Sequence, residues 1–247
     1  MTDFKVIILA IFDENDFQNK VSTKIHDKPM IQYVFESAQG AGATDIVVAT
    51  DSQRVGMIAE DFGATVCMIV DDELKGINRL SEVVARMGWD DDAIVVNVPA
   101  DAPLTPSAII QQVVDNLVAK EDVDFATLYS HISREAAEKE YTINMVVDNE
   151  GYVMYFSRCP IPFQSSDLDF TPEYKNYIEL SAYRVSLLKK YTELPKNALD
   201  SAENIEELKL LASGMKIHAA EASSLIGQRI FTEKDIGKVT LQIAPNR

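Results

Sequence analysis

The stretch Val95-Val96-Asn97-Val98-Pro99-Ala100-Asp101-Ala102-Pro103 decides the fold class. An apolar run ends abruptly, one carboxylate follows it, and Pro103 then interrupts the chain. Ligands bind at the carboxyl ends of strands in α/β sheets. An Asp in that place can hold Mg²⁺, which prefers oxygen ligands and bridges phosphates. Asp is also a common helix N-cap. The stretch therefore predicts a buried strand followed by an Asp101 that is either a magnesium ligand or a helix cap.

Strand-like and helix-like segments alternate around this stretch, which is typical of a mostly parallel sheet covered by helices. Apolar residues in the helix-like segments recur at the spacing of one helical face. In the first half we expect strands at 4–10, 45–50, 65–69 and 93–98. We expect helices at 29–41, from a cap at Asp51 or Ser52 through Phe62, at 79–87, and after Thr105-Pro106.

The second half is richer in strands. Two strand-like runs around the turn at 149–151 predict a β-hairpin over 143–156. Further strands are expected at 178–185 and 216–220, and helices at 203–213 and from Thr232 onward. We therefore expect one α/β domain with a doubly wound, Rossmann-like mixed sheet. Its parts are a nucleotide-binding half at 1–141, a small β-rich subdomain at 142–184, and a return to the core at 185–247.

The composition excludes several classes of protein. The formal net charge of −16, from 39 acidic and 23 basic residues, argues against a nucleic-acid-binding face. No apolar run approaches the roughly 20 residues that cross a membrane. The N-terminus lacks the basic start and cleavage site of a signal peptide. Cys67 and Cys159 lie in apolar segments without CxxC spacing, so we expect two reduced core residues of a cytoplasmic protein.

Several short segments, collinear over nearly the whole chain, resemble the CMP-Kdo synthetases, the 3-deoxy-manno-octulosonate (Kdo) cytidylyltransferases. The matching segments are Lys28-Pro29-Met30-Ile31, Ile46-Val47-Val48-Ala49-Thr50-Asp51, Arg79-Leu80-Ser81-Glu82-Val83, the stretch at Asp101, Tyr155-Phe156-Ser157-Arg158, Ala182-Tyr183-Arg184 and Glu206-Glu207-Leu208-Lys209. The resemblance implies a nucleotidyltransferase fold, transfer of CMP from CTP to a sugar acid for lipopolysaccharide synthesis, Mg²⁺ as cofactor, and a homodimer.

The resemblance also assigns roles to individual residues. It implies catalytic roles for Lys20 and Asp101, with Asp101 as the metal ligand. Substrate-binding roles fall to Gly76, Arg79, Arg158, Tyr183, Arg184 and Glu207. Two alternatives stay open: Arg158 either grips the carboxylate of a sugar acid or forms a surface ion pair, and Lys20 either contacts a phosphate or pairs with a local acid.

The loop that meets the triphosphate departs from the family pattern PARxxSxRLPGKPL. Ile11 and Asp16 stand at the two arginine positions, Asn19 replaces the glycine, and Lys20 survives. Asp13, Glu14 and Asp16 make the loop net negative. A close contact between like charges costs on the order of 1 to 4 kcal/mol, depending on the dielectric constant. We therefore expect this loop to repel a triphosphate.

Further departures point the same way. Phe231 stands where the family's VDTPEDL-like segment places a second metal-binding Asp. The nearby Glu233 and Asp235 suit the N-terminus of the last helix, where acids favour the helix dipole. A histidine before the family's GxYxYR segment becomes Tyr177, and a helix glutamine becomes Glu207.

These observations leave three hypotheses. The chain is a working cytidylyltransferase with an unusual loop, or it is a degenerate relative that keeps the fold and dimer and acts as a regulatory or binding partner of a true synthetase. In the third hypothesis, the protein acts on a different substrate, which is uncharged or cationic. We expect CTP chemistry to be weak or lost. Apolar runs at 153–156 and 161–163 predict a homodimer built through the second half.

Overall fold

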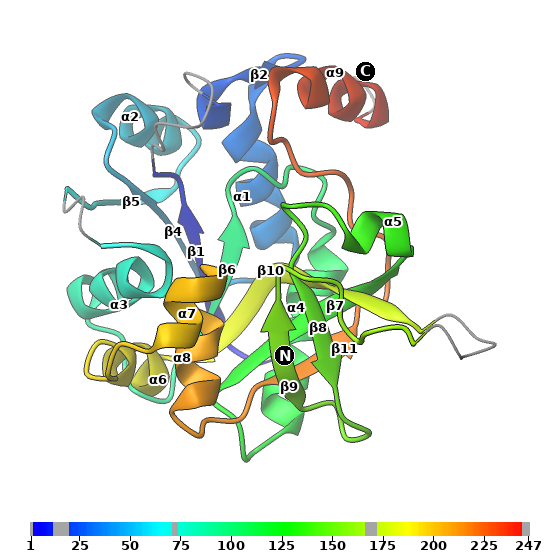
Figure 1. The fold of residues 1–247 in the computed structure, drawn as a ribbon. Helices are drawn as coiled ribbons and strands as arrows, with labels where there is room; N and C mark the ends of the chain where they lie inside the picture. Colours follow the sequence, from blue (N-terminus) through cyan, green and yellow to red (C-terminus); the bar gives the residue numbers. More distant parts are fainter. Residues whose placement is uncertain (1, 12–19, 71–73, 166–171, 244–247) are drawn as a thin grey trace.

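A computed structural model of the chain describes residues 2–11, 20–70, 74–165 and 172–243 (Figure 1). Within these ranges, nine strands form one sheet. Its main path runs in the order β11 (His218–Glu221), β7 (Phe125–Ile132), β10 (Tyr174–Arg184), β6 (Ile94–Pro99), β1 (Phe4–Leu9), β4 (Asp45–Thr50) and β5 (Thr65–Met68). The hairpin of β8 (Asn144–Val147) and β9 (Val153–Ser157) joins this path through β10. A separate small hairpin contains β2 (Lys24–Ile25) and β3 (Lys28–Pro29).

The sheet is mixed, as the sequence predicts. Strands β6, β1, β4 and β5 run parallel, so their carboxyl ends lie along one edge. Strand β10 runs antiparallel to both β6 and β7. Asp101 follows the end of β6 by two residues and therefore lies at the edge where α/β sheets bind ligands.

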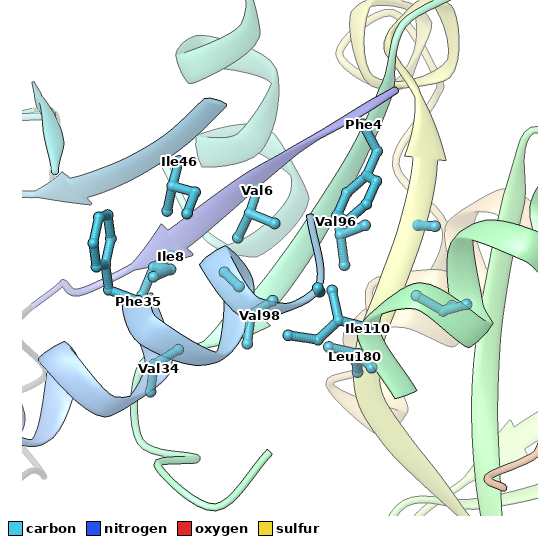
Figure 2. Packing of buried hydrophobic residues seen from close by; sticks show 14 of the residues in the cluster. Phe4, Val6, Ile8, Val34, Phe35, Ile46, Val96, Val98, Ile110 and Leu180 are labelled. Carbon is cyan, nitrogen blue, oxygen red and sulfur yellow. The ribbon is translucent and has the colours of Figure 1, made fainter. Parts of the chain in front are cut away.

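Helices cover both faces of the sheet, because apolar residues recur on one side of each helix. One face packs against α1 (Met30–Gly40), α2 (Gln53–Asp61) and α4 (Ser107–Ala119). Figure 2 shows part of this core, where Phe4, Val6 and Ile8 of β1 pack with Val34 and Phe35 of α1. The other face packs against α3 (Gly76–Met87), α6 (Val185–Tyr191) and α8 (Glu207–Ala212).

Local side chains determine where two helices begin. Ser52 caps α2 by accepting a hydrogen bond from the Val55 amide, which decides between the two predicted caps. Thr232 and Asp235 form a capping box at the start of α9 (Glu233–Gln242). The predicted role of Asp235 at this helix N-terminus is therefore confirmed.

Several boundaries differ from the prediction. The predicted helix at 203–213 is interrupted by Asn204, whose positive φ of 53° separates α7 (Ala198–Glu203) from α8. Helix α3 begins three residues earlier than expected, at Gly76, and β10 begins at Tyr174. The short helices η1 (Lys20–Ser22) and α6 were not expected as separate elements, whereas α5 (Arg134–Ala137) is the Glu- and Ala-containing helix expected after the strand that begins at Phe125. Cys67 is buried, but Cys159 is exposed, so the prediction of a core residue was wrong for Cys159.

Across the described ranges, none of the helices combines the length and the apolar character needed to cross a lipid bilayer.

Candidate functional site

Asp101 is a buried carboxylate with two cationic partners. Arg229 Nε lies 2.8 Å from Asp101 Oδ1, and Lys20 Nζ lies 3.0 Å from Asp101 Oδ2. The guanidinium of Arg229 also pairs with Glu179 of β10. Lys20, Asp101, Arg229 and Glu179 are called the ion set below. Both oxygens of the predicted metal ligand are therefore occupied by side chains of the same molecule.

The charges of the ion set determine the protonation state of Asp101. Burial alone would raise the pKa of this carboxyl, because desolvation disfavours the charged form. The neighbouring Arg229 and Lys20 outweigh that effect and hold the pKa of Asp101 below its ordinary value of 3.8. In turn, Glu179 and Asp101 raise the pKa of Arg229 despite its burial. Asp101 is thus ionised and neutralised internally.

Arg229 reaches Asp101 because the backbone around Ile230 is tied to the same turn. The Ile230 amide donates a hydrogen bond of 2.9 Å to the carbonyl of Asp101. The next residue, Phe231, then places its ring 5.1 Å from the Arg229 guanidinium carbon and 5.8 Å from Lys20 Nζ. Phe231 therefore contributes cation–π contacts to the ion set, in place of the carboxylate that the family has there.

The described residues do not fit a magnesium ion at this place. Mg²⁺ needs several oxygen ligands in near-octahedral geometry. Asp101 supplies two oxygens that already accept from cations, and Phe231 supplies none. Among the residues that the structure describes, no group of three or more His, Cys, Asp or Glu side chains could hold a metal. Arg229 instead brings its own positive charge to Asp101.

Gly76 and Arg79 lie beside the half-buried carboxylate of Glu206. Glu206 accepts a hydrogen bond of 2.5 Å from the Ile77 amide and so caps the N-terminus of α3 from a distant segment. A Cβ atom added at Gly76 would lie 1.9 Å from Glu206 Oε2. Desolvation raises the pKa of Glu206 above its ordinary value, and the positive charge of Arg79 offsets only part of that increase. Within the described ranges, the buried Arg79 Nε has no hydrogen-bond acceptor.

Arg158 is held by backbone carbonyls and by one more glutamate. Its guanidinium donates to the carbonyl oxygens of Glu203 at 3.2 Å, Glu140 at 3.3 Å and Asn204 at 3.4 Å. Its backbone amide donates to the Glu203 carboxylate at 2.8 Å. These contacts join β9 to the junction of α7 and α8, and the role of Arg158 toward a sugar-acid carboxylate stays a prediction.

Glu207 is half-buried at the start of α8. Its Oε1 lies 2.7 Å from the hydroxyl oxygen of Tyr177. Burial raises the pKa of Glu207 to about 7. Tyr183 lies nearby in the core, where its ring stacks on Phe125 at 4.5 Å between centroids. Both tyrosines have pKa values raised well above the ordinary range by burial.

Arg184 does not join the other predicted site residues. It pairs in register with Ile94, at the beginning of β6, whereas Asp101 follows the end of that strand. At about 3.3 Å per residue, this places it roughly 20 Å away along the sheet. Its guanidinium lies 3.5 Å from the Asp124 carboxylate instead. The structure therefore places Arg184 away from Asp101, and its substrate-binding role stays a prediction.

Part of the triphosphate loop lies outside the described residues. The predictions made for Asp13, Glu14, Asp16 and Asn19 concern residues that the structure does not describe. Ile11, at the first arginine position, is described, and it packs against the core formed by β1 and α3.

Sequence reasoning missed Arg229, Glu179, Glu203 and Glu206. One signal was available for Glu179, which stands at the glycine position of the family's GxYxYR segment. A charged side chain at a position of that kind marks a local rearrangement.

A cavity of about 630 Å³ lies beside the ion set. Glu179, Arg229 and Phe231 form part of its wall, and residues of β7, of β10 and of the segment 221–227 contribute to the remainder. The predicted site residues that the structure describes are not among its lining residues. The cavity therefore borders the ion set through Glu179 and Arg229.

Comparisons with known proteins agree with this fold. The family described as Cytidylyltransferase matches residues 5–217. The 3-deoxy-manno-octulosonate cytidylyltransferase of Pasteurella multocida is 36% identical over 97% of this chain and 98% of its own length. The corresponding protein of Vibrio parahaemolyticus is 37% identical over 98% of each chain.

Solved structures give the same result. A CMP:2-keto-3-deoxy-manno-octonic acid synthetase complexed with CTP superposes with a TM-score of 0.89, at 29% identity and 98% coverage of each chain. A cytidylyltransferase from Leptospira borgpetersenii has a TM-score of 0.61 at 15% identity, which shows the fold alone. The chain therefore belongs to the cytidylyltransferase family, among the 3-deoxy-manno-octulosonate cytidylyltransferases.

Proposed function

We propose that this protein is a degenerate member of its family, in which transfer of CMP from CTP to a Kdo-type sugar acid is lost or strongly weakened. The observation that carries the proposal is the buried ion set. Arg229 and Lys20 occupy the two oxygens of Asp101, the carboxylate that the family resemblance assigns to Mg²⁺.

The pairing of Arg229 and Lys20 with Asp101 disfavours CMP transfer because of the charge that this reaction needs. Attack of a sugar hydroxyl on the α-phosphorus of CTP requires positive charge beside the phosphates to stabilise the transition state. Here the positive charges of Arg229 and Lys20 are already neutralised by Asp101 and Glu179. A triphosphate would have to break these pairs before it could use the same cations.

The other predicted substrate contacts support the same conclusion. Glu203 and Glu206 hold Arg158 and the start of α3, the segment that contains Gly76. Glu207, beside them in the sequence, contacts Tyr177. Donors that would be expected to meet a nucleotide or a sugar acid are therefore used within the chain.

The remaining role that fits these observations is that of a binding partner. We propose that the protein forms a homodimer through 142–184 and regulates a catalytically complete relative by pairing with it through the same surface. Met154 of β9 and Phe163, which follows that strand, support this proposal because their side chains are 65% and 86% exposed. Large apolar side chains exposed in this way mark interaction surfaces when they cluster.

An assay of pyrophosphate release tests the loss of activity. The purified protein is incubated with CTP, Kdo and Mg²⁺, beside the Pasteurella multocida relative as a positive control. We expect turnover at least about a hundredfold below that of the control, a barrier increase of about 2.7 kcal/mol or more. Turnover comparable to that of the control contradicts the proposal.

A gain-of-function variant provides the second arm. Ile11→Arg, Asp16→Arg and Phe231→Asp restore the family residues, and Arg229→Ala frees the carboxylate of Asp101. We expect this variant to bind CTP·Mg²⁺ more tightly than the unmodified protein. Equal affinity would show that these positions do not limit nucleotide binding.

A further inference from the structure

A chain of five hydrogen-bond contacts runs from the half-buried Glu207 to the backbone of β10. Glu207 Oε1 lies 2.7 Å from the Tyr177 hydroxyl, which lies 3.0 Å from Ser181 Oγ. Ser181 Oγ lies 3.1 Å from Thr127 Oγ1. The Thr127 hydroxyl then donates to the carbonyl oxygens of Leu180 at 2.9 Å and Ile178 at 3.1 Å. These contacts are called the hydroxyl chain below.

The direction of the hydroxyl chain is fixed at one end. Backbone carbonyl oxygens only accept hydrogen bonds, so the single proton of Thr127 is used there. Ser181 must then donate to Thr127, and Tyr177 must donate to Ser181. Each hydroxyl has only one proton, so none remains for the contact between Tyr177 and Glu207.

The two carbonyl contacts of Thr127 share one proton, and each of the other three contacts needs one more. The hydroxyl chain therefore needs four protons, whereas its three hydroxyls supply three. An ionised Glu207 has no proton to add, and one close contact between buried oxygens would then lack a hydrogen. Buried polar groups without a partner are costly, so native interiors avoid them. The Tyr183 hydroxyl also forms a hydrogen bond with Ser181. This residue adds one contact together with one proton, so the hydroxyl chain still lacks one proton.

We propose that Glu207 is a neutral carboxylic acid in the folded protein and donates the fourth proton of the hydroxyl chain to Tyr177. The inference concerns the folded chain itself and does not depend on whether CMP transfer is retained.

The surroundings of Glu207 favour the neutral form. The residue is half-buried, and desolvation of its carboxyl raises the pKa of Glu207 to about 7. The ionisable groups that face it are acids, and they come from three elements: Tyr177, Glu179 and Tyr183 of β10, Glu206 at the start of α8, and Tyr191 of α6. A second negative charge beside these groups is disfavoured by repulsion and by desolvation.

The hydroxyl chain also connects Glu207 to the ion set. The hydroxyl chain ends on the carbonyls of Ile178 and Leu180, which flank Glu179. This segment contains the irregularity in the pairing of β10 with β7. Glu179 pairs from there with Arg229 of the ion set. The neutral Glu207 thus supports the backbone that presents Glu179 to Arg229.

Carbon-13 NMR of protein labelled at the glutamate carboxyl carbons tests the proposal. The Glu207 resonance is identified by its absence from the spectrum of Glu207→Gln, whose amide still donates to Tyr177. We expect the Glu207 resonance to titrate with a midpoint near pH 7, following its pKa of about 7. A midpoint near the ordinary value of 4.5 overturns the proposal.

The variant Thr127→Val separates the proton count from the effect of burial. Without the Thr127 hydroxyl, Tyr177 can donate to Glu207 and Ser181 can donate to Tyr177, so no carboxyl proton is needed. We expect the midpoint of Glu207 to fall by about one pH unit, the equivalent of one ordinary hydrogen bond. Ser181→Ala predicts the same direction of change and replaces this variant if Thr127→Val does not fold.

A matched control replaces an exposed threonine outside the hydroxyl chain. Thr65→Val, on β5, should leave the midpoint of Glu207 unchanged. If Thr127→Val and Ser181→Ala also leave it unchanged, burial alone sets the protonation of Glu207 and the hydroxyl chain does not require its proton.

Discussion

The guanidinium of Arg229 lies against the carboxylate of Asp101, with Nε 2.8 Å from Oδ1, although 128 positions separate the two residues in the sequence. This pair gives the end of strand β6 a fixed positive charge at the carboxylate where the family resemblance predicts a magnesium ion. Lys20 completes the neutralisation from the other side. The proposed loss of CMP transfer depends on this pairing of Asp101 with Arg229 and Lys20.

Removing Arg229 should destabilise the protein. Arg229→Ala leaves Asp101 buried with one cationic partner, and breaking a buried ion pair typically costs about 3 to 5 kcal/mol. Urea unfolding measures the change in the free energy of unfolding. Arg134→Ala is the control, because the pair of Arg134 with Glu138 is exposed and solvent screening should leave it little effect on stability. Equal losses for the two variants would show that the Arg229 pair contributes no more than a surface pair.

The stability contributed by Asp101 should disappear in acid. Its pKa is lowered in the folded protein, so the folded state favours the ionised form. That contribution is complete above the ordinary value of 3.8 and is lost as the pH falls through the lowered folded pKa. Unfolding experiments at a series of acidic pH values should show a steeper loss for the unmodified protein than for Asp101→Asn. Parallel curves would show that Asp101 is not ionised preferentially in the fold.

Gly76 should tolerate no side chain. Its φ is +39°, and an added Cβ would overlap the Glu206 carboxylate that caps α3. Gly63→Ala is the matched control, because Gly63 also has a positive φ of 88° but nothing lies within 4 Å of an added Cβ. We expect about 1 to 2 kcal/mol of destabilisation in the control and a larger loss in Gly76→Ala. A loss no larger than that of the control would mean that Glu206 moves freely away from the helix start.

The proposed homodimer should be visible in solution. Multi-angle light scattering at micromolar protein should give twice the chain mass of 27.5 kDa. Phe163→Ser, which removes a strongly exposed apolar side chain, should shift the protein toward the monomer. A mass of 27.5 kDa for the unmodified protein would contradict the assembly.

Regular patterning made much of the fold predictable. Apolar runs bounded by turn residues indicated β1, β4 and β6, and the hairpin around 149–151 follows from its turn residues. The break at Asn204 was missed, although Asn readily adopts the left-handed conformation in which it ends α7.

The site was predictable only in part. The position of Asp101 at the end of a strand follows from local sequence, but its partner Arg229 depends on how a distant segment crosses the sheet edge. The separation of Arg184 from Asp101 could not be foreseen, because the family resemblance gives no strand register. Long-range pairs of this kind need the three-dimensional arrangement.

Calorimetric titration of the unmodified protein with CTP in the presence of Mg²⁺ tests the central claim most directly. Loss of two phosphate-facing arginines removes charge-assisted hydrogen bonds of roughly 1.5 to 3 kcal/mol each, and the Arg229–Asp101 pair adds the cost of its displacement. The account predicts binding at least about a hundredfold weaker than that of the Pasteurella multocida relative, a difference of about 2.7 kcal/mol. Affinity equal to that of the relative would contradict it.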